Sequence, residues 1–291
     1  MSANTKRAVT KKGEAAAAGV VDANDVWPAV EAAPTSALII PFLAEPALDL
    51  SMVLPTYNES ENIAEAVAQL VAVLNGVPGL RYEIIVVDDD SPDRTWELAH
   101  QLRGKYPALR VIRRQGERGL ATAVVRGWQQ ARGSGLGVID ADLQHPPEMA
   151  SKLWEAIANG ADLAVASRHV EGGSLSDWKL HRRVISRGAQ TIGLLLLPEV
   201  VAKVKDPMSG YMMIRRTMLE GRELQPLGYK ILLEVLARAP LSAAAISEVP
   251  YTFRERNDGK SKVTTRVYAE YLQHLLRLRV LSIKRLLGIA K

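Results

Sequence analysis

An Asp-Ala-Asp sequence at residues 140–142 places two carboxylates at the end of a predicted strand. The apolar residues 137–139 before it are typical of a buried strand. In an extended chain, residues i and i+2 point the same way, so Asp140, Asp142 and Gln144 could present oxygen atoms to one side. Mg²⁺ and Mn²⁺ prefer such oxygen ligands, with substrate phosphates completing the shell. A plain turn is the other interpretation, because Asp is frequent in turns.

A run of acids, Asp-Asp-Asp-Ser-Pro-Asp, occupies residues 88–93 after another apolar segment. Ser91 or Asp93 could cap a helix that begins at Arg94, which accounts for at most one of the four acids. Three consecutive carboxylates repel one another, so a purely structural role explains the remaining acids poorly. The pattern favours contacts with a ligand, such as a base or ribose hydroxyls, or with a cation.

A third polar cluster, Pro-Thr-Tyr-Asn-Glu, occupies residues 55–59. Asn58 could cap the helix that follows, with Glu61 at the capping-box position. Tyr57 would then project from a loop, where its ring could stack on a base.

Basic residues form the fourth candidate group. Most surface Arg and Lys side chains are simply solvated, but the segment 253–262 contains glycine and is loop-like. A basic, flexible loop of this kind can fold over a diphosphate and exclude water. The cations considered are Arg168, Arg182, Arg183, Arg187, Arg254, Arg256, Lys260 and Lys262.

The elements that position these clusters alternate along the chain. Short apolar runs predict buried strands at residues 51–54, 82–87, 109–112, 137–139 and 162–166. Helical patterns lie between them, near residues 60–75, 93–105, 118–131 and 147–159. This alternation predicts an α/β fold with a parallel sheet that is covered on both faces. Ligands of such sheets gather at the carboxyl ends of the strands, and the polar clusters follow the predicted strands.

Composition narrows the classes of protein. The chain has 291 residues, 47% of them hydrophobic, which allows a sizeable core. It has no cysteine, so disulfides and thiolate metal sites are excluded. The net charge of +5 and the pI of about 9.4 suit anionic partners without choosing among them. A P-loop is absent, and the glycines of residues 133–137 precede a strand instead of following one, so neither a P-loop NTPase nor a Rossmann dehydrogenase is favoured.

Taken together, the segments resemble family 2 glycosyltransferases with the nucleotide-diphospho-sugar (GT-A) fold, and the dolichol-phosphate or polyprenol-phosphate mannose synthases among them. The resemblance runs from about residue 50 to the C-terminus. The landmarks, in order, are PTYNE (55–59), VVDDDSPDRT (86–95), GLATAVVRG (119–127), DADLQHPPE (140–148), ASR (166–168), KDPMSG (205–210), GYKILLE (228–234) and VPYTFRERNDGKSK (249–262).

The resemblance implies roles for individual residues. The nucleoside would contact Pro55, Tyr57, Glu59, Val87 and Asp89. Ribose, diphosphate and metal would contact Asp140, Ala141 and Asp142, with Asp142 and Gln144 as ligands of Mg²⁺ or Mn²⁺. The sugar and the acceptor phosphate would lie near Arg168 and Arg182, with Ser186 as a further acceptor contact, and Arg256 and Lys262 would clamp the diphosphate. Asp206 lies in one of the landmarks without an assigned role.

The activity implied is inverting transfer of a sugar, mannose from GDP-mannose, to a polyprenyl or dolichyl phosphate. An ionised acceptor phosphate needs no general base, and Glu234, the best spare acid, is interpreted as structural. Alternatives are a UDP-glucose or other UDP-sugar donor, a sugar-hydroxyl acceptor and a catalytically inactive nucleotide-binding subunit. Binding of nucleic acid is not expected, because aromatic residues do not alternate with the basic ones.

The predicted organisation has three parts: a flexible extension at 1–48, a GT-A catalytic domain at 49–264 and an amphipathic helix at 265–291. No apolar run is long enough to span a bilayer. The helix has an apolar stripe with basic residues beside it, Arg277 and Lys284 on one side and Arg279 on the other. It could lie on a membrane surface, or the stripe could pack on the domain or on a second copy. We expect a cytoplasmic protein peripherally bound to a membrane, with or without an anchoring partner subunit. The stripe consists of Leu272, Leu276, Val280, Ile283 and Leu287.

Overall fold

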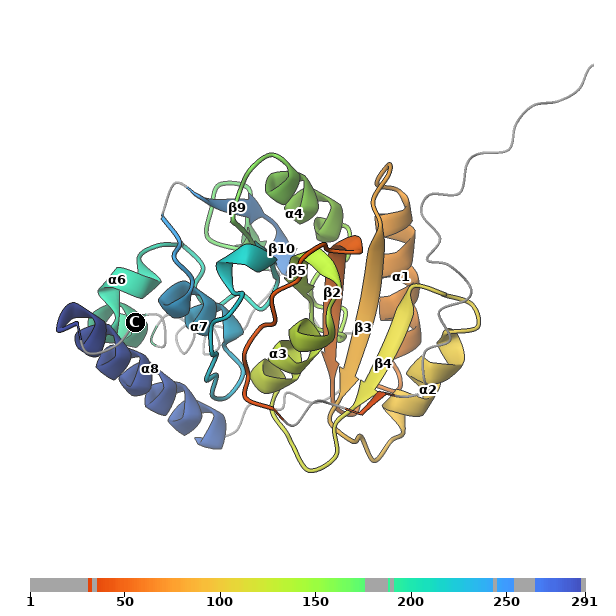
Figure 1. Ribbon diagram of the computed structural model, residues 1–291, viewed down its shortest axis with the longest axis horizontal. Coiled ribbons are helices and arrows are strands. Elements are labelled where there is room, and N and C mark those ends of the chain that lie inside the picture. Colours follow the sequence, from red (N-terminus) through yellow and green to blue (C-terminus); the bar gives the residue numbers. More distant parts are fainter. Residues whose placement is uncertain are drawn as a thin grey trace, which may run out of the picture.

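A mostly parallel sheet of eight strands forms the centre of the computed structural model, which describes residues 31–32, 36–175, 188, 191–242, 245–253 and 265–288 (Figure 1). The strand order is β1-β4-β3-β2-β5-β8-β6-β9. Only β8 runs antiparallel to its neighbours, β5 and β6, among the described strands. The strands are β1 (Glu31–Ala32), β2 (Leu48–Thr56), β3 (Tyr82–Asp88), β4 (Leu109–Arg113), β5 (Gly133–Val138), β6 (Leu163–Ser167), β8 (Met212–Arg215) and β9 (Ile246–Pro250).

Helices cover both faces of this sheet. Neighbouring residues of one strand belong to different hydrophobic clusters: Val53 lies in the cluster that includes residues of α3, α7 and α8, whereas Leu54 lies in the cluster that includes residues of α1 and α4. Central strands such as β2 and β3 therefore bury both faces, which is why the sequence shows apolar runs there. The helices are α1 (Ile63–Asn75), α2 (Thr95–Leu102), α3 (Leu120–Gln130), α4 (Met149–Ala158), α6 (Pro198–Val201), α7 (Ile231–Arg238) and α8 (Thr265–Leu286). A short 3-10 helix spans Arg216–Met218, and β7 (Ser174–Leu175) pairs with β10 (Thr252–Phe253).

The predicted α/β fold is confirmed, including the five strands and four helices expected from the alternating pattern. The largest shift is at β5, which begins at Gly133 instead of residue 137. Its glycines serve close packing: a Cβ at Gly133 would lie 2.6 Å from the Ser51 backbone nitrogen, and one at Gly137 would lie 2.1 Å from the Met52 sulfur. Neither β8 nor β9 was predicted.

The segment before β2 is packed where the structure describes it. Glu31 of β1 forms a partly buried ion pair with Arg110 of β4, at 2.7 Å. Ile40 is fully buried, and its backbone pairs with Glu220. This part of the chain differs from the flexible extension expected from its composition, because its partners lie far along the sequence. Residues 1–30 lie outside the described residues.

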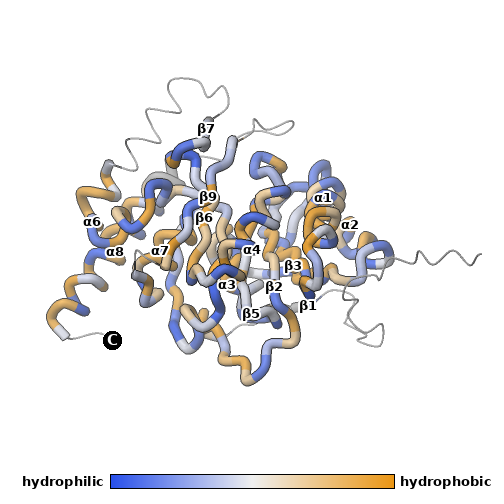
Figure 2. The backbone as a smooth tube through the Cα atoms, turned by 90° about the horizontal axis from the view of Figure 1, so that it is seen from above, coloured by the Kyte–Doolittle hydropathy of each residue, from blue (hydrophilic) through white to orange (hydrophobic). Residues whose placement is uncertain are grey.

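The C-terminal helix α8 packs through the face opposite to the predicted stripe. Tyr271, His274, Leu275 and Leu278 are buried against the domain. The five stripe residues are 42–66% exposed, so the stripe does not pack on the described part of the domain. Both views show α6, α7 and α8 on the side of the molecule away from α1 and α2 (Figures 1 and 2). Within the described residues, no helix combines the length and apolar character needed to cross a bilayer.

Candidate active site

The polar clusters meet at the carboxyl ends of β2, β3, β5 and β6, as the parallel sheet predicts. Thr56 and Asp88 are register partners at the last residues of β2 and β3, and the Thr56 hydroxyl donates to Asp88 at 2.8 Å. The Asp89 amide donates to the Thr56 carbonyl at 3.0 Å. One strand over, the Ile139 amide donates to the Val53 carbonyl, which brings the end of β5 beside β2.

Every acid of the 88–93 run has a protein partner. Asp88 is fully buried and accepts from the amide and hydroxyl of Ser91, at 2.8 and 2.7 Å. Burial raises the pKa of Asp88, although these hydrogen bonds oppose the rise. Asp90 pairs with Arg113 at 2.6 Å. Asp93 accepts the amides of Thr95, the first residue of α2, and Ser60, at 3.0 and 3.1 Å.

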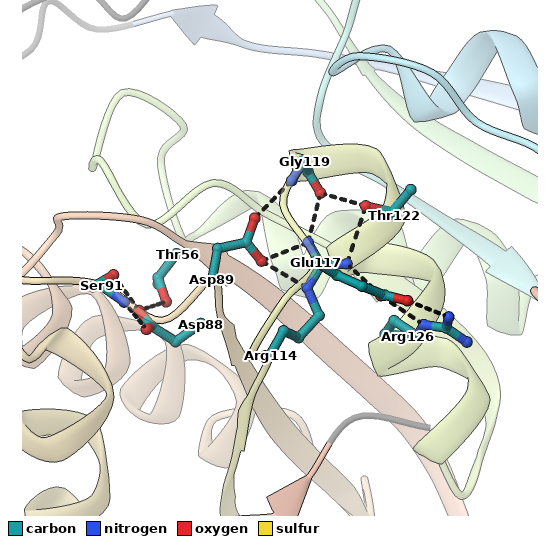
Figure 3. A network of polar contacts seen from close by, with 9 residues as sticks. All are labelled: Thr56, Asp88, Asp89, Ser91, Arg114, Glu117, Gly119, Thr122 and Arg126. Carbon is teal, nitrogen blue, oxygen red and sulfur yellow. Dashed lines mark hydrogen bonds and ion pairs between the residues drawn. The ribbon is translucent and has the colours of Figure 1, made fainter. Parts of the chain in front are cut away.

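Asp89 is held by two residues of the loop between β4 and α3 (Figure 3). The buried Arg114 donates through Nε to its Oδ1 at 2.6 Å, and the Gly119 amide donates to its Oδ2 at 2.7 Å. Arg114 also donates to the Gly119 carbonyl at 3.0 Å and lies beside Glu117, which pairs with Arg126 at 2.6 Å. Burial raises the pKa of Asp89, and the Arg114 charge opposes the rise. The carboxylate is thus fixed in position at the end of β3.

These contacts correct the argument from repulsion. The acids were expected to need a ligand because three consecutive carboxylates repel one another, but Arg113 and Arg114 at the end of β4 pair with Asp90 and Asp89. The structure therefore explains the acidic run without a ligand. Contact between Asp89 and a nucleoside stays a prediction.

The Tyr57 loop differs from its expected capping role. Asn58 has a left-handed φ of 53° and its amide donates to Ser91 Oγ at 3.0 Å, so it does not cap α1, which begins at Ile63. Buried Glu59 accepts from the Asn62 side chain at 2.8 Å. Tyr57 is half-buried, and the Arg118 guanidinium lies 4.9 Å from its ring centre. Pro55 and Val87, the other predicted nucleoside contacts, are buried register partners of β2 and β3 beneath this loop.

The Asp-Ala-Asp segment forms a turn. Asp142 Oδ1 accepts the Gln144 amide at 3.1 Å, and Leu143 has a φ of 60°. The extended geometry that would align Asp140, Asp142 and Gln144 therefore ends before Gln144. Asp140 Oδ2 lies 3.6 Å from His145 Nε2, and Ala141 is buried.

The oxygen atoms of Asp140, Asp142 and Gln144 could bind a hard cation only if a substrate supplied further ligands. Among the described residues, no three acidic or histidine side chains gather as a complete metal site. Two half-buried carboxylates and one amide oxygen remain at the turn, all of them the oxygen donors that Mg²⁺ and Mn²⁺ prefer. Phosphate oxygens would have to supply further ligands.

Arg168, at the end of β6, is held by Asp206. The pair is bidentate, with both distances 2.7 Å, and both side chains are buried. Burial by itself would raise the pKa of Asp206, but the hydrogen bonds and the charge of Arg168 outweigh burial, so the pKa of Asp206 is lowered. Glu248 of β9 in turn accepts the Asp206 amide at 3.2 Å. The structure thus supplies the role that the sequence left open for Asp206: it orients Arg168.

Lys230 is a cation of the site that sequence reasoning missed. Its Nζ donates to the Met208 carbonyl at 2.7 Å, next to the Asp206 segment. Burial, followed by the charge of Arg168, lowers the pKa of Lys230 to about 8, while Asp206 and Asp140 oppose the shift. The only sequence signal was its place in the GYKILLE landmark.

Glu234 is structural. It is fully buried and accepts from the Gln225 amide at 2.6 Å and from His274 at 2.9 Å, and it also pairs with Arg238. Arg182, Ser186, Arg256 and Lys262 lie outside the described residues, so their roles stay predictions.

Comparison with known proteins gives one family. The model of glycosyl transferase family 2 matches residues 51–222. The dolichol-phosphate mannosyltransferase of Pyrococcus furiosus is 48% identical over 231 residues, 79% of this chain and 64% of that protein. The dolichol-phosphate mannosyltransferase of Saccharomyces cerevisiae is 38% identical, covering 80% of this chain and 88% of the relative. The polyprenol monophosphomannose synthase of Mycolicibacterium smegmatis is 37% identical, covering 77% and 84%.

Solved structures agree on the fold. Mannosyl-3-phosphoglycerate synthase from Rubrobacter xylanophilus superposes with a TM-score of 0.60 at 22% identity, covering 84% of this chain and 76% of that one. Glucosyl-3-phosphoglycerate synthase from Mycobacterium tuberculosis, in complex with Mn²⁺, UDP and glucosyl-3-phosphoglycerate, superposes with a TM-score of 0.57 at 22% identity, covering 81% of this chain and 80% of that one.

Proposed function

The chain belongs to glycosyl transferase family 2, and from this premise we propose that it transfers mannose from GDP-mannose to a polyprenyl or dolichyl phosphate. The observation that carries the proposal is the agreement of relatives from an archaeon, a yeast and a bacterium, all named for mannose transfer to such lipids. The chain covers 64% of the archaeal relative but 88% and 84% of the other two.

The nucleoside would bind at the ends of β2 and β3. Tyr57 offers a ring for the base, and Asp89 offers a fixed carboxylate. The diphosphate would lie at the Asp140–Asp142 turn, where a bound Mg²⁺ or Mn²⁺ ion would neutralise charge on the leaving group. Arg168 and Lys230 would face the transferred sugar and the phosphates, and Arg256 and Lys262 would close over them.

The proposed reaction needs no protein base. An ionised oxygen of the acceptor phosphate forms a bond to the anomeric carbon, while the bond from that carbon to the diphosphate breaks on the opposite side. The electron pair leaves with the nucleoside diphosphate, whose growing charge the site cations stabilise. The contacts of Glu234 support this scheme, because they commit the best spare carboxylate to the core.

We also place the protein in the cytoplasm, peripherally bound to a membrane through α8. The exposed apolar stripe supports this, with exposed Arg277 and Lys284 beside it, a pattern that suits an anionic bilayer surface. Arg279 pairs with Glu199 at 3.1 Å, so this flank of the stripe is partly neutralised. A second copy of the chain or an anchoring subunit could cover the same stripe.

A donor panel tests the proposal. Purified protein would receive GDP-mannose, GDP-glucose, UDP-glucose and UDP-mannose with polyprenyl phosphate and Mg²⁺, and the lipid product would be weighed by mass spectrometry. We expect a hexose-phosphate lipid from GDP-mannose. Product from a UDP-sugar alone would show the wrong donor, and no product from any donor would favour an inactive nucleotide-binding subunit.

A further inference from the structure

An exposed arginine lies over the ring expected to receive the base. Arg118 belongs to the loop of residues 114–119 between β4 and α3. Its guanidinium carbon is 4.9 Å from the Tyr57 ring centre, within the distance of a cation–π contact. Tyr57 follows directly after β2, which ends at Thr56.

This loop is anchored at one end to the nucleoside site (Figure 3). The Gly119 amide donates to Asp89, and the Gly119 carbonyl accepts from Arg114, at 2.7 and 3.0 Å. Gly119 has a φ of 133° and Gly116 a φ of 82°, conformations that side-chain-bearing residues rarely adopt. Arg118 thus stands between two glycines and next to a fixed backbone, and the residue is exposed although its guanidinium lies over the Tyr57 ring.

We propose that Arg118 and Tyr57 form a clamp for the base of the donor nucleotide, a role that rests on the proposed function. The planar guanidinium stacks on one face of the base, and the Tyr57 ring stacks on the other. The Arg118 side chain now covers the ring face that the base needs, so it swings outward by about one stacked layer when the base enters. Because Asp89 holds Gly119, this movement stays within the side chain and the residues 116–118.

A clamp predicts a different pattern from a phosphate contact. Stacking acts on the base, so its loss weakens GMP and GDP by the same factor. A charge acting on the phosphates affects GDP more than GMP and is restored by lysine, which keeps the charge but not the plane.

The test measures the Kd of GMP and GDP by titration calorimetry for the full chain, Arg118→Ala and Arg118→Lys. We expect both nucleotides to bind about five- to thirtyfold more weakly to Arg118→Ala, in line with the loss of one stacked partner. Arg118→Lys should recover little. Lys105→Ala is the matched control, because Lys105 lies 5.1 Å over the Tyr106 ring just before the opposite end of β4.

An unchanged Kd in Arg118→Ala overturns the clamp, and so does a loss that grows from GMP to GDP and is restored in Arg118→Lys. UMP and UDP are measured in parallel. Stacking tolerates any base. If the wild-type protein binds only the uridine series, an equal loss of UMP and UDP affinity in Arg118→Ala supports the clamp and rejects GDP-mannose as donor. If the wild-type protein binds neither series, the proposed function fails and the clamp with it.

Discussion

Lys230 should make binding of the donor nucleotide depend on pH above about 8. Its ammonium donates to the Met208 carbonyl, and the charges that act on it are those of Arg168, Asp206 and Asp140. Burial lowers its pKa from the usual 10.5 to about 8. In the free protein Lys230 therefore loses its proton as the pH rises through about 8.

The sign of the effect follows from linkage. A diphosphate beside Lys230 favours the charged ammonium, so the pKa of Lys230 rises in the complex and binding takes up a proton above about pH 8. If the bound diphosphate fully compensated the effects of burial and Arg168, the pKa of Lys230 would return from about 8 to its usual 10.5. Because Lys230 is only half-buried, water screens part of this interaction, and we expect a rise of about one unit, or a tenfold change in Kd.

The assay is the Kd of GDP with Mg²⁺, measured by titration calorimetry from pH 7 to 10. The Kd should stay constant below about pH 8 and rise about tenfold by pH 10. Lys230→Arg, which stays charged, should lose this rise, and Lys230→Met should bind weakly at every pH. Circular dichroism would confirm that each variant is folded. A wild-type Kd that is flat across the range, or the same slope in Lys230→Met, would refute the reasoning.

Four further changes test the site and the helix. Asp142→Ala should lower turnover at least about a hundredfold without changing the melting temperature by more than a few degrees, and activity in EDTA would contradict a metal role. Asp206→Asn should lower both turnover and melting temperature. The pKa of Asp206 is lowered, so the ionised carboxylate stabilises the folded protein above about pH 4, and this stability is lost as the pH falls through the lowered pKa. Asp206→Asn should lack this pH-dependent part of the unfolding free energy. Glu234→Gln should melt earlier yet keep turnover within about tenfold, whereas a loss of about a hundredfold in folded protein would indicate a general base. Leu276→Glu should abolish flotation with anionic liposomes and leave turnover on a short, soluble acceptor unchanged; a wild-type protein that never floats at low salt would instead assign the stripe to a protein partner.

The sheet was predictable where strands bury both faces. The run at Tyr82–Asp88 is buried throughout, and its sequence is apolar apart from Glu83, which pairs with Arg110, and Asp88 at its end. The edge strand β9 is half-buried along most of its length and mixes Ser and Glu with apolar residues, so it shows no period. Strand β8 pairs with β5 and β6, which lie far from it in the sequence, and the local sequence of β8 does not predict that pairing.

The position of the candidate site on the sheet was predictable from the sequence, but the residues that pair with its charged side chains were not. Acid clusters after strands locate the edge of the sheet, yet the cations that hold them lie elsewhere in the chain. Arg114 is 25 positions from Asp89, and Asp206 is 38 positions from Arg168. Helix α8 shows the same limit: it carries apolar residues on two faces, and the face that turns inward includes His274, whose partner Glu234 lies 40 positions earlier in the chain.

The charges of the site argue for an anionic ligand at Arg168 and Lys230. Asp206 is buried and committed to Arg168 by two hydrogen bonds, so the pair is close to neutral. Lys230 donates to a carbonyl oxygen. Burial, followed by the like charge of Arg168, lowers its pKa, while Asp206 and Asp140 oppose the shift. A half-buried ammonium held in this way costs stability unless a partner anion arrives. A diphosphate or an acceptor phosphate would supply that charge, which supports our proposal that Lys230 lies in the substrate site.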